Sequence, residues 1–237
     1  MKTFLYKLSL PLIAVALFSS CAAITKHGPE VKETRQVAAF SRIHAESAFE
    51  IDYTSGNSTS LIVEAPDDLM GKIKTEVNNG TLEISLKGET NNINSSLKIH
   101  LQSPALEAAN LEGACQLDLL SALNGTDFHL DLSGASSFRG TIYMKTVFIN
   151  MEGASTADIG GTTNRFTVEV DGASTLNADK FSAAIADVKA EGASNATIQA
   201  DSSLDANANG ASTISYRGNP VMLNRNTDGA GNIMKEK

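Results

Sequence analysis

The chain has 237 residues, enough for one sizeable domain, and its 27 acidic against 19 basic residues give a net charge of −8. An acidic chain lacks the basic footprint of nucleic-acid-binding proteins, so we expect no nucleic-acid partner. With no tryptophan and only 5% aromatic residues, the composition excludes a wide core layered with large rings. It favours a narrow core of small and branched side chains.

The first segment, residues 1–20, has the pattern of a secretory signal. Lys2 and Lys7 precede an apolar run at residues 8–18, and small residues lead into Cys21. The run is too short to cross a bilayer comfortably. One interpretation is an ordinary signal peptide cut near Ala22. The other is a lipoprotein signal, because residues 18–21, Phe-Ser-Ser-Cys, resemble a lipobox. That resemblance implies a lipid on Cys21 and, by Gram-negative sorting rules, an anchor in the outer membrane.

The rest of the chain divides into four parts. Residues 21–35 are polar and typical of a tether. Residues 36–105 alternate between apolar and polar types, and we expect them to form the N-terminal strands and the cap, with one helical turn at residues 67–70. Residues 106–218 carry an internal repeat. Residues 219–237 are expected to form a C-terminal cap or tail.

The internal repeat is the strongest signal in the sequence. The tripeptide Gly-Ala-Ser, once Gly-Ala-Cys, occurs six times at spacings between 18 and 21 residues. Its glycines are Gly113, Gly134, Gly153, Gly172, Gly192 and Gly210. Apolar residues stand two and four positions before each glycine and four positions after it, with polar residues between them. This alternation predicts a half-buried strand, a bend at the glycine and a second short strand.

A period near 20 residues, with strands and no helical segment, predicts a parallel β-solenoid in which each coil bonds to the next. Glycine suits the sharp bend because it accepts positive φ. Two positions later a serine column begins with Cys115, which we expect to be a small buried residue rather than a reactive thiol. With Cys21 lipidated, no intramolecular disulfide is available. Hexapeptide repeats do not fit the variable spacing, and the motifs of calcium-binding nonapeptide and leucine-rich repeats are absent.

Further motifs appear in a fixed order around the repeat: Phe40-Ser-Arg-Ile43, Leu61-Ile-Val-Glu-Ala65, Asn79-Gly-Thr-Leu82 and Tyr216-Arg-Gly-Asn-Pro220. Together with the glycine repeat they resemble the bacterial "putative auto-transporter adhesin, head GIN domain" family of Bacteroidetes lipoproteins, over about residues 38–233. The resemblance implies a right-handed parallel β-helix with pectin-lyase-like winding. It also implies an adhesive role and no established catalytic site.

One column of charged side chains is a candidate ligand face. The acidic residues directly before the bends are Glu112, Glu152, Asp171 and Glu191. Three interpretations stay open: a solvated outward column, a cation or carbohydrate contact, and a catalytic pair. The last is disfavoured because a repeated column singles out no residue.

The remaining polar and aromatic candidates give weaker signals. The histidines lie far apart and show no metal-ligand spacing: His27, His44, His100 and His129. Nucleotide-binding and nucleophile-elbow motifs are absent. We therefore expect no metal, no cofactor and no catalytic residue. Three tyrosines could form a sugar-binding platform or simply pack and cap the fold: Tyr53, Tyr143 and Tyr216.

The sequence supports three functional hypotheses. The first is a non-enzymatic, lipid-anchored protein of the outer membrane or cell surface, an adhesin or scaffold that binds a glycan or protein through a repetitive polar face. The second is a carbohydrate-active β-helix enzyme or a degenerate relative, which a groove with carboxylates out of step with the repeat would favour. The third is a structural or signalling-associated envelope protein without a dedicated ligand. Homo-oligomers through coil ends or a flat face stay open.

Overall fold

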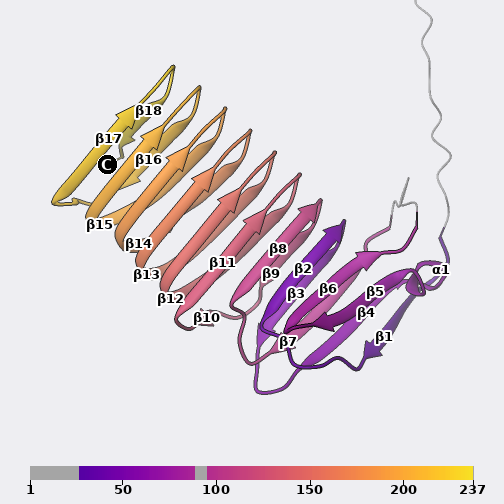
Figure 1. Cartoon of the computed structure of the whole chain (residues 1–237). Coiled ribbons are helices and arrows are strands. Elements are labelled where there is room, and N and C mark those ends of the chain that lie inside the picture. The colour runs from indigo at the N-terminus through magenta and orange to yellow at the C-terminus, as the bar shows by residue number, and fades with distance from the viewer. Residues whose placement is uncertain (1–26, 89–94, 237) are drawn as a thin grey trace, which may run out of the picture.

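A computed structural model describes residues 27–88 and 95–236 of the chain. It is 67% strand and 2% helix, and it winds into a β-solenoid of about 7 turns, roughly 19 residues apart (Figure 1). The predicted parallel β-helix is confirmed. The signal segment 1–20, Cys21 and residues 22–26 of the expected tether lie outside the described residues. Within the described ranges, no helix is long and apolar enough to span a bilayer.

Each coil contributes two strand segments joined by the glycine bend. In the long strands β12 (Ser137–Met151), β13 (Thr156–Val170), β14 (Thr175–Ala190) and β15 (Asn195–Ala208), one half follows a bend and the other half precedes the next. Parallel pairing keeps like halves together, as in Ser137 with Thr156 and Met151 with Val170. The solenoid therefore has two sheets, which we name the pre-bend sheet and the post-bend sheet.

Shorter strands continue both sheets toward the two ends. The pre-bend sheet also contains β2 (Arg42–Ser47), β8 (Ala108–Gly113), β11 (Asp127–Leu132) and β17 (Met222–Thr227). The post-bend sheet also contains β3 (Glu50–Ser55), β9 (Gln116–Leu119), β16 (Thr213–Arg217) and β18 (Asn232–Lys235). The two-residue strand β10 (Leu123–Asn124) pairs with β12 where one coil turns.

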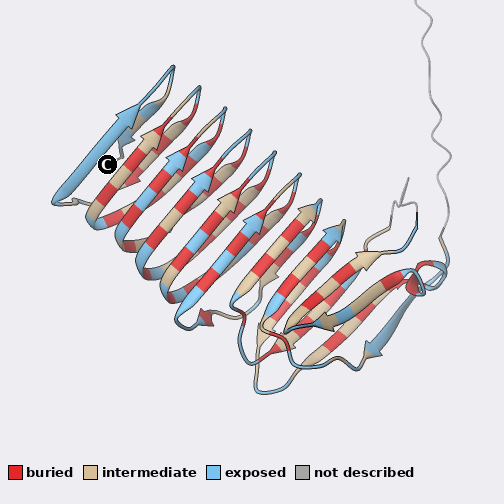
Figure 2. Cartoon of the chain, in the orientation of Figure 1, coloured by how far each residue is buried: buried red, intermediate tan, exposed pale blue. Residues whose placement is uncertain are grey.

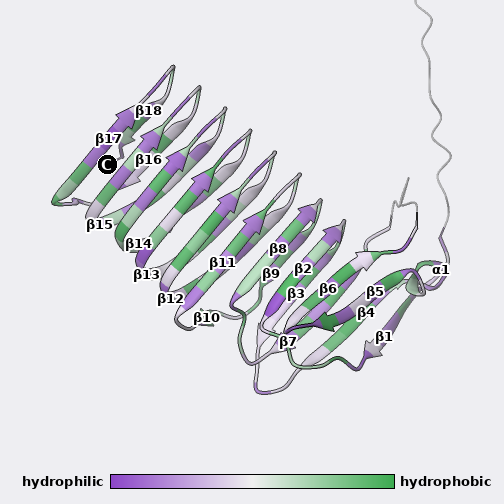
Figure 3. Cartoon of the chain, viewed as in Figure 1, coloured by the Kyte–Doolittle hydropathy of each residue, from purple (hydrophilic) through white to green (hydrophobic). Residues whose placement is uncertain are grey.

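The core between the sheets is narrow, as the composition predicts. Buried and exposed residues alternate along every long strand (Figure 2), and hydropathy alternates with them (Figure 3). One inward column, six positions before the bend, consists of Phe128, Val147, Phe166, Ala186 and Leu204, all buried. Large and small side chains share a column because neighbouring rungs must fill the same narrow space.

The six predicted glycines stack along one ridge. Each has a φ between +69° and +87°, the region that glycine alone enters without penalty. A β-carbon on Gly153 would lie 2.5 Å from the carbonyl oxygen of Gly134, one coil earlier. Glycine is thus required twice, by backbone conformation and by the close stacking of coils.

The same ridge extends one coil further at each end than the tripeptide indicates. Gly229 has a φ of +68° and stacks on Gly210, and Ser47 occupies the ridge below Gly113 with a φ of +98°. Ser47 tolerates this position because the pairing of β2 with its outer neighbour ends at Ala45. No coil of the described chain therefore presses on its β-carbon from that side.

Replacing Ser47 with glycine should stabilise the protein by about 1 kcal/mol, because a left-handed conformation costs a non-glycine residue about 1–2 kcal/mol. The measurement is the free energy of unfolding from denaturant titration. Asn79→Gly is the matched control: Asn79 also has a positive φ, of 50°, but asparagine tolerates this conformation and the gain should be smaller. A loss of stability in Ser47→Gly would contradict the assigned bend geometry.

The buried serine column is present, and several of its hydroxyls bond to backbone carbonyls near the bend. Ser194 Oγ donates to the carbonyl oxygens of Glu191, at 2.6 Å, and Val170, at 2.9 Å, and Ser212 Oγ donates to that of Ala190, at 2.9 Å. These bonds add to the backbone bonds that the same carbonyls accept, as Val170 O does from Glu191 N and Ala190 O from Asn209 N, both at 2.8 Å. Cys115 fills the first place of the column and is buried, as predicted.

The N-terminal region is threaded in an order that the sequence does not reveal. The coil of β2 and β3 lies between β8–β9 on one side and β6 (Thr81–Leu86) with β7 (Lys98–Ser103) on the other. Later residues thus wrap around earlier ones. His44 of β2 consequently has neighbours from two distant parts of the chain.

The predicted cap consists of antiparallel strands at this end. β1 (Glu30–Arg35) pairs with β4 (Ser60–Pro66), and β5 (Ile73–Asn78) pairs with β6. The helical turn α1 (Asp67–Met70) lies where it was expected. The expected tether, residues 21–35, is wrong for its last six residues, because they form β1, whose charged side chains suit an exposed sheet edge.

Arg35 ties the two capping edges together. From β1 its guanidinium donates to the carbonyl oxygens of Ile73, at 2.7 Å, and Met70, at 3.0 Å. The guanidinium thus bonds to backbone carbonyls at the end of α1 and at the start of β5. This contact closes the N-terminal end of the solenoid.

The C-terminal segment differs from its prediction. Residues 219–237 were expected to cap or trail the fold, but β17 and β18 form another coil on the same parallel register. All residues of β17 are exposed (Figure 2). The sequence does not reveal this coil, because Asp228-Gly229-Ala230 repeats the bend without the serine that follows the earlier bends.

Candidate functional site

The predicted acidic column is a structural feature of the pre-bend sheet. Each residue's amide bonds to the preceding coil, as Glu152 N donates to Leu132 O at 2.8 Å and Asp171 N to Met151 O at 2.8 Å. The structure extends the column by one coil on the N-terminal side, since Glu46 pairs in register with Glu112. All four predicted column residues thus lie in line on one outer edge.

The C-terminal part of this column is solvated and partly neutralised. Lys189 Nζ lies 3.1 Å from Glu191 Oε1. The hydrogen bond from Lys189, with a second from the Asn209 amide, lowers the pKa of Glu191 below its ordinary value. A carboxylate that is stabilised in its charged form at the surface is a poor general acid. These contacts favour an outward ionic column over a catalytic pair.

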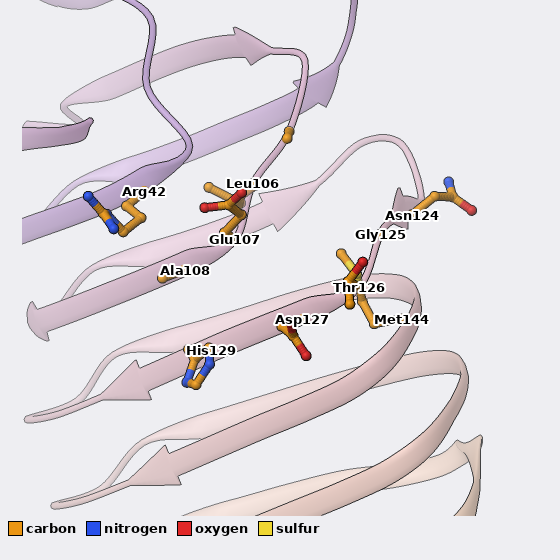
Figure 4. Close-up of a pocket in the computed structure, with 11 residues that line it drawn as sticks. Arg42, Leu106, Glu107, Ala108, Asn124, Gly125, Thr126, Asp127, His129 and Met144 are labelled. Atoms are coloured by element: carbon orange, nitrogen blue, oxygen red, sulfur yellow. The ribbon is translucent and has the colours of Figure 1, made fainter. Parts of the chain in front are cut away.

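The outer face of the pre-bend sheet carries a row of three hollows, each of which shares lining residues with the next. A hollow of about 540 Å³ is lined by residues of β2, β11 and the segments before β8 and β11, including Arg42, Glu107, Asp127 and His129 (Figure 4). A second hollow of about 200 Å³ shares His129, and a third of about 90 Å³ shares Asn150 and Glu169 with the second. We call these three hollows together the trough.

The trough begins where the repeat is irregular. The coil between Gly113 and Gly134 has the longest of the five spacings, and it contains the short strand β10. Residues 105–107 and 125–126 lie outside regular strands, and they line the sides of the first hollow. His129 N still donates to Glu107 O at 2.9 Å, so the coils remain joined beneath the opening.

Two aromatic rings form part of the trough surface. His129 and Phe148 are register partners on β11 and β12, and their rings stack with centroids 4.6 Å apart and planes 14° apart. Phe148 keeps 36% of its surface exposed. A flat, exposed aromatic pair offers an apolar surface for the face of a sugar ring or for another planar group.

The tyrosines considered from sequence do not form such a platform. Tyr53 and Tyr216 are buried in the core, and Tyr143 alone of the three is exposed, at 46%. Burial and the lost solvation of the phenolate raise the pKa of Tyr53. The sequence pattern that could have identified Phe148 as an exposed ring is the alternation around it. Val147 and Ile149 point inward, so Phe148 between them points outward.

Charge in the trough is mainly negative. Glu107, Asp127, Asp131 and Glu169 line its first two hollows, with Arg42 as the basic residue that lines them. Further along the sheet, burial and the neighbouring charges of Asp205 and Glu169 raise the pKa of Asp187. The field disfavours polyanionic ligands and favours neutral or cationic groups.

The outer face of the post-bend sheet carries, next to the bend, a column of small polar residues in strict register: Gln116, Ser137, Thr156, Thr175, Asn195, Thr213 and Asn232. Beyond this column a hollow of about 390 Å³ is lined by charged and polar side chains: Asp158, Asn177, Asp179, Thr197, Arg217 and Glu236. Arg217 pairs there with Asp179 and Glu236, and no aromatic ring lines this hollow.

Two histidines lie in acidic surroundings near the capped end. On the post-bend sheet His100 Nδ1 lies 3.2 Å from Asp52 Oδ2 and Nε2 3.4 Å from Glu64 Oε2. Lys32, 2.9 Å from Glu64, and then His100 lower the pKa of Glu64. On the pre-bend sheet His44 lies among carboxylates of three strands. Sequence spacing missed both clusters, because their members come from strands far apart in the chain.

Comparison with known proteins gives one family and several similar folds. A family model described as "Putative auto-transporter adhesin, head GIN domain" matches residues 39–220. No curated protein matches the chain.

Several solved structures share the fold. The crystal structure of a putative adhesin from Bacteroides fragilis superposes with a TM-score of 0.83 at 21% identity, covering 88% of this chain and 97% of that one. A putative adhesin from Parabacteroides distasonis gives a TM-score of 0.73 at 17% identity, over 88% and 98%. A putative lipid-binding protein from the same organism gives 0.64 at 22% identity, over 89% and 98%.

Proposed function

The chain belongs to the family described as "Putative auto-transporter adhesin, head GIN domain", and from this premise we propose that it is a non-enzymatic cell-envelope protein that binds a surface glycan in the trough. The observation that carries the proposal is the row of three hollows along one face, with shared lining residues and a stacked aromatic pair among them. Several weak contacts along a polymer add up to useful affinity.

The chemistry of the trough favours a glycan without acidic groups. Carboxylates such as Asp131 and amides such as Asn150 accept or donate hydrogen bonds to hydroxyl groups, while Phe148 and His129 offer a ring surface. A polyanion would be repelled by the acidic residues on both sides. A protein segment rich in Lys or Arg is the alternative ligand that this charge admits.

We further propose that Cys21 carries the lipid anchor and holds the protein at the outer membrane or cell surface. The described chain begins at His27, whose Nδ1 lies 2.9 Å from Asp68 Oδ2 at the capped end. An anchor just before it would place the capped end toward the membrane. The open trough and the C-terminal coils would then face away from the lipid.

A carbohydrate-active enzyme is the second candidate, and one observation favours it. Glu107 and Asp127 line the first hollow of the trough from neighbouring coils, and neither belongs to the repeated acidic column. Paired carboxylates are the usual catalytic groups of glycoside hydrolysis. We prefer a binding role to a catalytic one, because Glu107 Oε2 already accepts a hydrogen bond from Ser41 Oγ at 2.9 Å and both carboxylates are exposed to solvent.

Binding should depend on Phe148. The test is a screen of the chain, with Cys21 replaced by serine, on a glycan array, followed by calorimetry with a soluble fragment of the best polymer. Phe148→Ala should weaken binding about 5- to 13-fold, because losing an aromatic contact costs about 1–1.5 kcal/mol. Tyr143→Ala removes a comparably exposed ring outside the trough and should leave binding unchanged.

The outcomes separate the candidates. If both variants lost the same glycan affinity, or if Phe148→Ala lost none, the glycan would not bind in the trough and the proposal would be contradicted. Shortened oligosaccharides in the same incubation would support the enzyme instead. Binding to basic peptides but to no glycan would favour a protein ligand.

A further inference from the structure

We propose that His44, Glu46 and Glu112 form a binding site for a divalent transition-metal ion of the zinc type, with Glu83 orienting the imidazole. The site lies on the outer face of the pre-bend sheet near the capped end. Its ligand atoms all lie within 4.8 Å of one another. The inference is independent of the proposed glycan ligand.

The threading of the N-terminal region creates this cluster. His44 and Glu46 stand two residues apart on β2, so their side chains share one face. Glu112 on β8 is the register partner of Glu46, and Glu83 on β6 is the register partner of His44. Three strands therefore deliver one imidazole and three carboxylates to the same patch of sheet.

The two distances from the imidazole fit a tetrahedral ion, and the ligand atoms all lie within 4.8 Å of one another. His44 Nε2 lies 3.3 Å from Glu112 Oε1 and 3.5 Å from Glu46 Oε1. With zinc–ligand bonds of about 2.0–2.1 Å, neighbouring ligand atoms of a tetrahedral site lie about 3.3–3.4 Å apart. One His and two carboxylates supply three ligands and leave a fourth position for water.

A second-strand carboxylate next to Nδ1 suits the imidazole to this role. His44 Nδ1 lies 2.8 Å from Glu83 Oε2, while Nε2 faces Glu46 and Glu112. Such a partner fixes the proton on Nδ1 and leaves the Nε2 lone pair for a metal, as in carboxylate–histidine–zinc arrangements. Nε2 is itself buried and makes no hydrogen bond among the described residues.

The local charge gives an independent reason for a cation. Glu46 and Glu112 are directly adjacent across parallel strands, and like charges in this position destabilise a sheet. A neutral imidazole facing two carboxylates adds a third electron-rich group. A divalent ion between them turns these repulsions into bonds. An ion pair between the imidazole and Glu112, whose Oε1 lies 3.3 Å from Nε2, is the competing arrangement, and the spectroscopic test below separates it from a bound metal.

The experiment is a competition titration of the full chain, carrying Cys21→Ser, against a chromogenic chelator with Zn²⁺ as the probe. We expect one bound ion per chain. Glu112→Gln, which keeps the size of an exposed side chain, should weaken binding by about 100-fold, and Glu83→Gln by about 10–100-fold through the lost orientation. Glu152→Gln lies in the same acidic column without a histidine and is the matched control, expected to have no effect.

A spectroscopic readout decides between a metal and a proton on the imidazole. In ¹⁵N NMR, zinc should shift the Nε2 resonance of His44 while Nδ1 keeps its proton. The proposal is overturned if Glu152→Gln weakens binding as much as Glu112→Gln, if binding is not one ion per chain, or if zinc leaves the His44 resonances unchanged.

Discussion

Replacing Gly153 with alanine should destabilise the protein by about 3–5 kcal/mol, which places it among the most damaging single substitutions. The left-handed conformation at φ +78° accounts for about 1–2 kcal/mol of this. The rest arises because the new β-carbon would lie 2.5 Å from the Gly134 carbonyl oxygen. That oxygen belongs to the backbone of a hydrogen-bonded coil, so neither coil can move without losing ladder bonds.

Gly160 in the same coil provides the control. A β-carbon there would meet its nearest atom at 3.6 Å, and its φ lies outside the left-handed range. Gly160→Ala should therefore change the free energy of unfolding by less than about 1 kcal/mol, with stabilisation the expected sign. Chemical denaturation of both variants, followed by circular dichroism, measures the difference. Similar values for the two would mean that the glycine ridge does not set the coil spacing.

The second large effect is expected in the core. Phe166 is fully buried and packs edge-on against Phe181, with ring centroids 4.9 Å apart. Truncating a buried phenylalanine to alanine costs about 3–5 kcal/mol, since the transfer free energy is lost and a cavity remains. The inward column offers no flexible neighbour to fill that cavity, because Val147 and Ala186 flank Phe166 on the adjacent coils.

Phe148→Ala tests the same alternation from the other side of the sheet. Phe148 faces outward on β12, and its loss should cost about 1 kcal/mol or less. Denaturant midpoints with unchanged slopes would report stability alone. If Phe148→Ala proved as damaging as Phe166→Ala, the assignment of inward and outward positions would be wrong.

The sequence predicts the regular part of the fold because each coil repeats one physical problem. A sharp bend needs a residue such as Gly153, a buried slot beside it needs a small residue such as Ser194 or Cys115, and a two-sided strand needs alternation. Local chemistry and tertiary contact agree at these positions, so a single chain shows them. The structure confirms the parallel winding, the glycine ridge and the buried Cys115.

What the sequence does not predict depends on exceptions to the repeat. The last coil was missed because Gly229 is followed by Ala-Gly rather than Ala-Ser, and the first because Ser47 replaces glycine. The trough arises where one coil is longer, and no pattern marks a coil as hollow. His44 meets Glu83 and Glu112 only through the insertion of β2 between later strands.

The most direct test of the functional account compares two threonines on opposite faces. Thr167 lines the trough, and Thr175 belongs to the polar post-bend column. Each is replaced by cysteine in the Cys21→Ser chain and labelled with an environment-sensitive fluorophore. Cys115 will not compete for the label, because burial raises the pKa of its thiol to about 11. We predict that the glycan selected by the array changes the fluorescence at Thr167→Cys and leaves that at Thr175→Cys constant. A response confined to Thr175→Cys would place the ligand on the opposite sheet and contradict the account.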